Sequence, residues 1–170
     1  RGAYNKLCRI SPSELAAGVV TYSSGNHAQG IAAVAQLLSA PATIIMPADV
    51  PKIKVKNTQS YGADILTYDR DSTVEREVLA KEFSEEQGAV LVSPFDDPYI
   101  IAGQGTVGLE IVEQAEELDA ELDMVLVPCG GGGLVSGIAL ALGSKCPNVA
   151  VYAVEPTGFD SMARSIASGK

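Results

Sequence analysis

Short apolar segments that are typical of buried strands alternate with segments of helical periodicity along almost the whole chain. The strand-like runs are bounded by Gly, Pro or polar turns, and between them apolar residues recur three and four positions apart. The predicted strands are 19–22, 42–46, 63–68, 89–92, 124–128 and 150–155, and the predicted helices are 27–39, 51–59, 73–87, 99–118 and 134–145. Strands separated by helices of this length pair in parallel through right-handed crossovers. The pattern therefore predicts an α/β fold with open, doubly wound, mostly parallel sheets.

Local signals predict one more helix near the N-terminus. Ser11-Pro12-Ser13-Glu14 has the spacing of a capping box with proline in the first turn, and Gly18 is placed to end the short helix that follows. Gly88 is a natural C-cap for the helix predicted before it.

Composition and charge argue against several classes of function. The 170 residues are 46% hydrophobic and 19% charged, enough to bury a core. The net charge of -9 at pH 7 repels phosphodiester backbones, so we expect no nucleic-acid partner. Each apolar run is interrupted before it could span a bilayer, so we expect no membrane insertion. The three cysteines lack the spacing of a disulfide framework or zinc site, which favours a reducing, cytoplasmic compartment.

A glycine-rich loop, Cys129-Gly130-Gly131-Gly132-Gly133-Leu134, separates a predicted strand from a predicted helix. Four glycines remove every Cβ from the path of an incoming group, and their N–H groups can converge on one anion beside the positive end of the helix. A plain turn would need one or two glycines, because each carries an entropic cost. The loop therefore predicts a phosphate-binding site.

The same glycines leave a second interpretation open. Gly131, Gly133 and Gly137 also fit a dinucleotide-binding pattern, and Glu155 ends the next predicted strand, where a ribose-binding acid would fall. A nicotinamide-binding Rossmann domain of an oxidoreductase is the alternative hypothesis.

Another polar loop, Ser23 to His27, also connects a predicted strand to a predicted helix. Two hydroxyls, an amide and an imidazole crowd the start of that helix, which predicts a site for an anion such as a carboxylate. Helix capping by Ser or Asn is the structural alternative. His27 is the single histidine of the chain, and we interpret its side chain as a structural hydrogen-bonding group.

These motifs resemble those of fold-type II pyridoxal-phosphate (PLP) enzymes of the serine/threonine dehydratase and serine racemase family. The segment 23–30, Ser-Ser-Gly-Asn-His-Ala-Gln-Gly, is similar to the family's substrate-carboxylate loop, and Gly130 to Gly133 with Leu134 to its tetraglycine phosphate loop. Residues 94–98 and 101–106 resemble the family's segment between these two loops. Arg1-Gly2-Ala3 resembles the end of the family motif Ser-Phe-Lys-x-Arg-Gly-Ala. The resemblance covers essentially the whole chain.

The resemblance implies a role for each of these residues. Gly130, Gly131, Gly132, Gly133 and Leu134 would bind the phosphate of pyridoxal 5'-phosphate, and Asn26 would hydrogen-bond its phenolic oxygen. Ser23, with the backbone around Gly25 and His27, would hold the substrate carboxylate. Ser24 stands where racemases carry a second acid/base, on the face opposite the family's lysine, although it could equally bind carboxylate or cap the helix.

The implied reaction is β-elimination from a small hydroxy amino acid (serine, threonine or 3-hydroxyaspartate), which gives a keto acid and ammonia, or racemisation of the same substrate. The Ser23-Ser24 pair favours members that resemble serine racemase or hydroxyaspartate dehydratase. A regulatory or binding module that kept the fold and lost the lysine is a third, non-enzymatic hypothesis.

Two departures from the family pattern limit the prediction. The family's Schiff-base lysine lies two residues before Arg1, so we expect these 170 residues to be an inactive part of a longer chain. Some members bind a divalent cation such as Mg²⁺, and Glu155 resembles one of its ligands, although Ser161 stands where a second carboxylate would be expected.

The resemblance also implies the domain organisation. A small domain, residues 18–98, would be inserted into a larger PLP-binding domain that includes residues 1–17 and 99–170, with the active site in the cleft between them. A homodimer is expected for the complete enzyme.

Overall fold

The computed structural model describes residues 1–71 and 75–169, which form two compact units. The N-terminal unit comprises residues 3–94, and the C-terminal unit comprises residues 1–2 and 95–170. The predicted domain boundaries at 17/18 and 98/99 stay a prediction. The compact units group residues 3–17 with the first sheet, because the helix over Pro12–Ala17 packs on it and the Ala3 methyl lies 3.4 Å from where a Cβ of Gly30 would stand.

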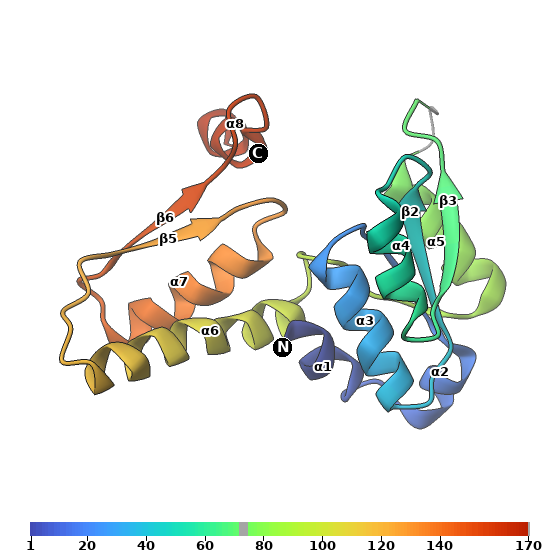
Figure 1. The fold of residues 1–170 in the computed structure, drawn as a ribbon, viewed down its shortest axis with the longest axis horizontal. Helices are drawn as coiled ribbons and strands as arrows, with labels where there is room; N and C mark the ends of the chain where they lie inside the picture. Colours follow the sequence, from blue (N-terminus) through green and yellow to red (C-terminus); the bar gives the residue numbers. More distant parts are fainter. Residues whose placement is uncertain (72–74, 170) are drawn as a thin grey trace. The chain divides into compact units, whose positions relative to one another are not determined.

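The N-terminal unit is built on a four-stranded parallel sheet (Figure 1). Its strands are β1 (Val19–Tyr22), β2 (Ala42–Pro47), β3 (Asp64–Tyr68) and β4 (Val90–Leu91), in the order β3-β2-β1-β4. Val19 pairs with Ala42 on one side and Val90 on the other, so the chain reverses its direction across the sheet between β1 and β4. This is the switch point at which doubly wound sheets bind ligands, beyond the carboxyl ends of the strands.

Helices cover both faces of this sheet. They are α2 (Pro12–Ala17), α3 (Asn26–Leu37), α4 (Lys52–Gln59) and α5 (Arg76–Gln87). Right-handed crossovers put α3 and α4 on one face and α5, which contacts β1, β2 and β4, on the other. The capping box predicted at Ser11 is confirmed, as are the C-caps at Gly18 and at Gly88, which has a left-handed φ of 69°.

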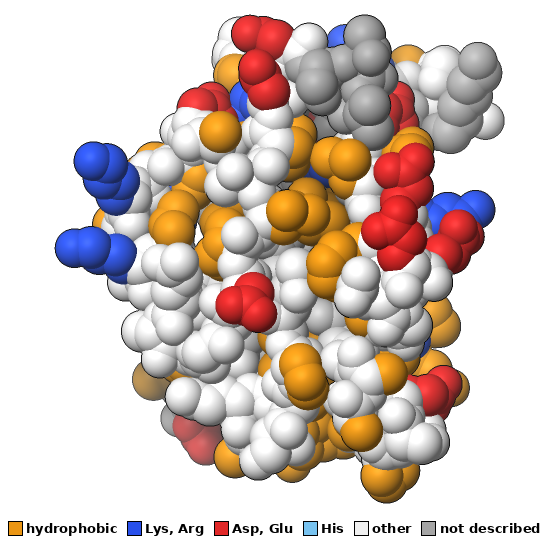
Figure 2. Space-filling view, turned by 90° about the vertical axis from the view of Figure 1, so that its right-hand side faces the viewer, with side chains coloured by type: hydrophobic (Ala, Val, Ile, Leu, Met, Phe, Trp, Pro, Cys, Tyr) orange, Lys and Arg blue, Asp and Glu red, His pale blue; other side chains and the backbone are white. Residues whose placement is uncertain are grey.

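The core of this unit lies around its two central strands. All four residues of β1 are buried, whereas β3 is an edge strand whose Leu66 is 42% exposed. Figure 2, which shows the right-hand side of the view in Figure 1, has hydrophobic side chains interspersed with polar and acidic ones. A central strand such as β1 is buried on both faces, as is usual for strands of parallel sheets.

The C-terminal unit contains a two-stranded parallel sheet of β5 (Met124–Pro128) and β6 (Ala150–Val154). The helices α6 (Pro98–Glu117) and α7 (Gly133–Lys145) pack on one another and beneath this sheet (Figure 1). Val112, Val127, Ile138 and Leu142 form the buried core between them. On the opposite face of the sheet, Leu126 and Tyr152 are 62% and 54% exposed. The last helix, α8 (Ser161–Ser168), follows β6.

The structure adds elements that the sequence pattern did not predict. The helix α1 (Gly2–Leu7) has no capping signal and depends on burial of Leu7, which is 0% exposed. The helix α8 also escaped prediction, because it has no side-chain cap of its own and no buried residue. The predicted start of a helix at Thr73 lies outside the described residues. In the described part of the chain, every helix is too short or too polar to cross a membrane.

Candidate functional site

The loop after β1 positions the first group of predicted residues. Its first residue extends the sheet, since the Ser23 N–H donates to the Ile45 carbonyl at 3.1 Å, and the Ser23 Oγ then accepts from the Gly25 N–H at 3.3 Å. The N-cap of α3 is Gly25, and no side chain caps it. Capping by Ser24 or Asn26, the structural alternative, is therefore wrong. The N-cap residue of α3 therefore offers no side-chain acceptor to the first turn, and the Cβ position of Gly25 has nothing within 4 Å.

The His27 side chain belongs to a chain of hydrogen bonds with Thr21 and Val92, called the Thr21–His27 relay below, and is not a free catalytic base. Its Nε2 lies 3.1 Å from the Oγ1 of Thr21, and this Oγ1 donates to the carbonyl oxygen of Val92 at 2.6 Å. Because a carbonyl oxygen can only accept, the Thr21 proton points to Val92 and the His27 Nε2 must be the donor. The imidazole thus connects α3 to β1 and the end of β4, as the structural interpretation predicted, while its backbone stays at the helix N-terminus.

A cation that the sequence analysis did not single out lies at the same edge of the sheet. The Arg76 guanidinium, at the start of α5, stacks 5.7 Å from the ring centroid of Tyr22, the residue before Ser23. It also donates from Nε to Glu77 at 2.9 Å, and that hydrogen bond is the main cause that raises the pKa of Arg76. Sequence periodicity gives no signal for this contact, because it depends on α5 crossing back over the sheet.

The second group lies in the tetraglycine loop between β5 and α7. The Cys129 N–H still extends the ladder, donating to the Val154 carbonyl at 2.9 Å, and the chain then turns at Gly132, whose φ is +89°. Gly132 is the N-cap of α7, without a side-chain cap, so the helix begins at Gly133 rather than at the predicted Leu134. The first turn of α7 therefore offers backbone amides to an anion.

Packing within the protein gives a second reason for the glycines, beside the predicted phosphate site. A Cβ at Gly131 would lie 2.1 Å from the Phe95 ring, and one at Gly133 would lie 2.9 Å from the Phe95 Cα. Packing against Phe95 thus requires glycine at two of these positions, and their predicted role in binding phosphate stays a prediction. A Cβ at Gly130 would meet nothing within 4 Å, so only this glycine is open in the way that was predicted for all four.

Cys129 precedes this loop and contacts it through its side chain. Its Sγ lies 3.6 Å from the Gly130 carbonyl oxygen and also interacts with the Gly132 N–H. Burial, followed by the negative charge of Glu155, raises the pKa of the thiol. Cys129 is therefore held as the neutral thiol, which is a poor nucleophile.

Glu155 uses both carboxylate oxygens to cap α8. Its Oε1 accepts from the Met162 N–H at 2.9 Å and its Oε2 from the Ala163 N–H at 3.0 Å, and Ser161 adds a 3.4 Å contact. The two backbone hydrogen bonds lower the pKa of Glu155. Among the described residues, no group of three His, Cys, Asp or Glu side chains could hold a metal ion. Metal binding by Glu155 stays a prediction.

The N-terminal residues are anchored to α6. Both terminal nitrogens of Arg1 donate to the Glu110 carboxylate, one at 2.6 Å, and Arg1 also donates to Thr106 at 3.0 Å. The Gly2 N–H donates to Gln104 at 3.2 Å. The Arg1 hydrogen bond lowers the pKa of Glu110. The segment that resembles the end of the family's lysine motif is thus fixed to the helix beneath the second sheet.

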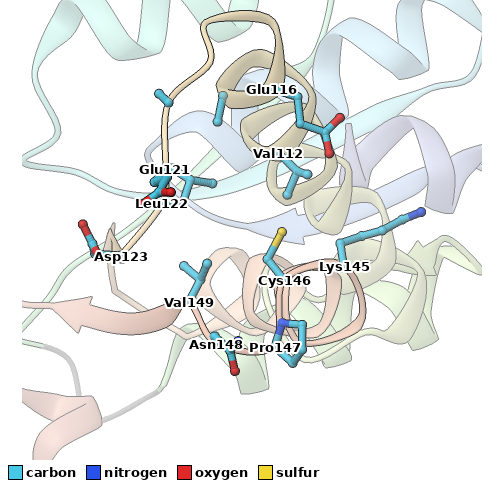
Figure 3. Close-up of a pocket in the computed structure, with 12 residues that line it drawn as sticks. Val112, Glu116, Glu121, Leu122, Asp123, Lys145, Cys146, Pro147, Asn148 and Val149 are labelled. Atoms are coloured by element: carbon cyan, nitrogen blue, oxygen red, sulfur yellow. The ribbon is translucent and has the colours of Figure 1, made fainter.

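A pocket of about 470 Å³ lies at the opposite end of β5 and β6 from the tetraglycine loop (Figure 3). Figure 3 shows the Cys146 sulfur pointing toward Val112 in its floor, with Glu121, Asp123 and Asn148 around the edge. No predicted site residue lines it. Pocket size alone therefore does not locate the predicted chemistry.

The two predicted loops share one local construction. Each follows the carboxyl end of a parallel strand, opens through a glycine with free space at its Cβ position, and starts a helix with no side-chain cap. The construction suits a phosphate or a carboxylate, because both anions accept several N–H groups at once. The residues present therefore fit the two anionic groups that the sequence analysis assigned to them.

Comparisons with known proteins agree with this chemistry. A family model described as "Pyridoxal-phosphate dependent enzyme" matches residues 1–170. The chain is 46% identical to a serine racemase of Schizosaccharomyces pombe over 169 residues, 99% of this chain and 51% of that protein. It is 45% identical to an L-threo-3-hydroxyaspartate ammonia-lyase of Saccharomyces cerevisiae, covering 99% of this chain and 50% of that protein.

Solved structures agree as well. The structure of maize serine racemase matches with a TM-score of 0.89 at 44% identity, over 99% of this chain and 50% of that one, which confirms the α/β class with parallel sheets. The chain spans about half the length of the curated relatives that it matches. The matches do not support the nicotinamide-binding alternative.

Proposed function

Because the chain belongs to the family of pyridoxal-phosphate-dependent enzymes, we propose that it supplies the phosphate-binding and carboxylate-binding loops of an enzyme acting on a small hydroxy amino acid. The reaction is β-elimination from serine, threonine or 3-hydroxyaspartate to a keto acid and ammonia, racemisation, or both. The single observation that carries this proposal is the pair of glycine-led helix N-termini without side-chain caps, at Gly25 and Gly132.

The tetraglycine loop holds the phosphate of the cofactor. Backbone N–H groups of the segment Gly130 to Leu134, which leads into the start of α7, would donate to this phosphate, and the helix dipole adds a partial positive charge. No lysine or arginine is needed in this arrangement, because several aligned amides can neutralise one phosphate. When bound, the cofactor withdraws electrons from the α-carbon of the amino acid and so lowers the cost of removing the α-proton.

The loop after β1 holds the substrate. The Ser23 hydroxyl and the backbone N–H groups at the start of α3, near Gly25 and His27, donate hydrogen bonds to the carboxylate, while the Asn26 side-chain amide donates to the phenolic oxygen of the cofactor. The Thr21–His27 relay fixes the first turn of α3 and therefore the direction of these amides. Arg76, which is paired with Glu77, stacks on Tyr22 at the start of the loop.

Ser24 holds or moves the proton that decides between the two outcomes. The side chain is half-buried and is not used to cap α3, so its hydroxyl is free for another role. If it delivers a proton to the face of the α-carbon opposite the family's lysine, the amino acid is inverted; without that delivery, loss of the β-hydroxyl prevails.

A protein of the relatives' length that contains this chain provides the test. We expect it to bind PLP and to form keto acid from at least one of L-serine, L-threonine and L-threo-3-hydroxyaspartate, measured by coupled reduction of the keto acid. Chiral chromatography measures the D-amino acid. Absence of both products, together with tight NADH binding, would overturn the proposal.

A serine pair within the loop separates the roles of its hydroxyls. Ser24→Ala should lower racemisation by about 10²–10⁴-fold while elimination continues, because general acid–base groups contribute factors of that size. Ser23→Ala is the matched control and should raise the KM of both reactions together. Equal losses of both reactions in Ser24→Ala would contradict the role of Ser24 as the second acid/base.

The remaining predictions for the whole protein belong to the same proposal. We expect a homodimer in the cytoplasm, without nucleic-acid or membrane partners, and a Mg²⁺ dependence only if Glu155 can exchange its helix-capping hydrogen bonds for a metal ion.

A further inference from the structure

Three of the four loop glycines have an explanation within the protein itself. A Cβ at Gly131 would lie 2.1, 2.3 and 2.6 Å from three ring atoms of Phe95, and a Cβ at Gly133 would lie 2.9 Å from its Cα. Gly132 has a φ of +89°, and a Cβ there would lie 2.7 Å from the Met162 Cε. Gly130 is exposed and has no such neighbour.

Phe95 is in turn held by the start of α6. Two residues later, Asp97 is buried, and its Oδ1 accepts from the N–H groups of Tyr99 and Ile100 at 2.8 and 3.1 Å. Phe95 is also the first residue of the C-terminal unit after the chain leaves Pro94. The cap of α6 thus fixes the backbone two residues after Phe95, whose ring contacts the loop.

The geometry points to Phe95 as a positioning residue for the phosphate loop. Its ring packs against the Gly131–Gly133 backbone and holds it in one conformation, which leaves Gly130 as the side from which the phosphate approaches. This inference rests on the proposed function. A loop of four glycines would otherwise sample many conformations, and each lost conformation weakens binding. The ring removes that freedom before the anion arrives.

The experiment compares two ligands that differ only in the phosphate. The variants are made in the protein of the relatives' length. Phe95→Ala should weaken the affinity for PLP by about 10-fold or more, in line with losses seen for residues that orient binding groups. The milder Phe95→Leu should weaken it less. Affinity for pyridoxal, which lacks the phosphate, should stay unchanged. Inorganic phosphate followed by ³¹P NMR is the second probe, and its binding should weaken in parallel with PLP.

Two glycine variants test the other half of the inference. Gly131→Ala should lower both thermal stability and PLP affinity in the parent protein, and should cost much less stability once Phe95 is alanine, because the ring that it strikes is gone. Gly130→Ala should leave the melting temperature of the cofactor-free protein unchanged and still weaken PLP binding.

The outcomes are distinguishable. Equal loss of PLP and pyridoxal binding in Phe95→Ala, or no loss of either, would overturn the role of Phe95 while the proposed function stands. Additive effects of the Gly131 and Phe95 variants would also overturn it. Failure of the parent protein to bind PLP at all would remove the proposed function and this inference together.

Discussion

Thr21 lies between His27 and Val92, accepting a hydrogen bond from the imidazole Nε2 at 3.1 Å and donating one to the carbonyl oxygen at 2.6 Å. The threonine is 0% exposed, so its hydroxyl depends on these two partners rather than on water. The hydroxyl joins β1, β4 and the first turn of α3 at the switch point of the sheet.

Thr21→Val should therefore destabilise the protein by about 1–3 kcal/mol, the usual cost of leaving a buried polar group unsatisfied. Urea unfolding measures the change. Thr67→Val, on the exposed part of the edge strand β3, is the matched control and should stay within about 0.5 kcal/mol of the parent. Equal effects of the two valines would show that the relay does not stabilise the fold.

The relay also shows what the sequence could and could not predict. The α/β alternation, the parallel pairing and the capping box at Ser11 follow from local periodicity and local hydrogen bonds, and all are confirmed. The contacts of His27 with Thr21, and of Phe95 with Gly131, join residues whose proximity depends on how loops return to a sheet edge or a helix start. No local pattern encodes such contacts, which is why the tetraglycine loop was predicted as a loop while its packing against Phe95 was not.

Two helices are capped by carboxylates, and for a related reason only one of these caps could be predicted from the sequence. At Ser11, the acid that completes the cap is three residues away, a spacing visible in the sequence. At α8, the cap comes from Glu155, which precedes the helix by six residues and reaches it across a turn. The sequence therefore gave no sign that Glu155 caps α8, and its predicted metal binding stays a prediction.

Asp97 should be the more important of two aspartates at helix starts. It caps α6 through two hydrogen bonds, so Asp97→Ala should cost about 0.5–2 kcal/mol. Asp160 stands at the N-cap of α8 without a side-chain cap bond, and Asp160→Ala should cost much less. Thermal unfolding of the two variants decides the matter, and a larger loss at Asp160 would contradict the capping geometry.

The attachment of α8 should depend on pH through Glu155. Its pKa in the folded protein is lowered from 4.5 by the Met162 and Ala163 N–H groups, so its contribution is fully present above about pH 4.5 and is lost as the pH falls through the lowered value. NMR signals of those two amides should shift with the titration. In Glu155→Gln the titration should be absent, and an unchanged titration would mean that another acid holds the helix.

Two glycines that both lie in helices should respond oppositely to alanine. At Gly103 in α6, a Cβ would lie 2.6 Å from the Gly2 Cα and 2.8 Å from its nitrogen, so the added methyl meets backbone that cannot rotate away. Gly103→Ala should destabilise the protein by about 1–3 kcal/mol, as overpacking does, and should free the Arg1–Gly2 segment from α6.

At Gly143 in α7, a Cβ would meet nothing within 4 Å, and Gly143→Ala should stabilise the helix by about 0.5–1 kcal/mol. Thermal unfolding together with hydrogen exchange of the α6 amides measures both effects. If both alanines proved neutral, the close packing of Gly2 on Gly103 would not exist in solution, and the segment preceding Ala3 would not be held by α6.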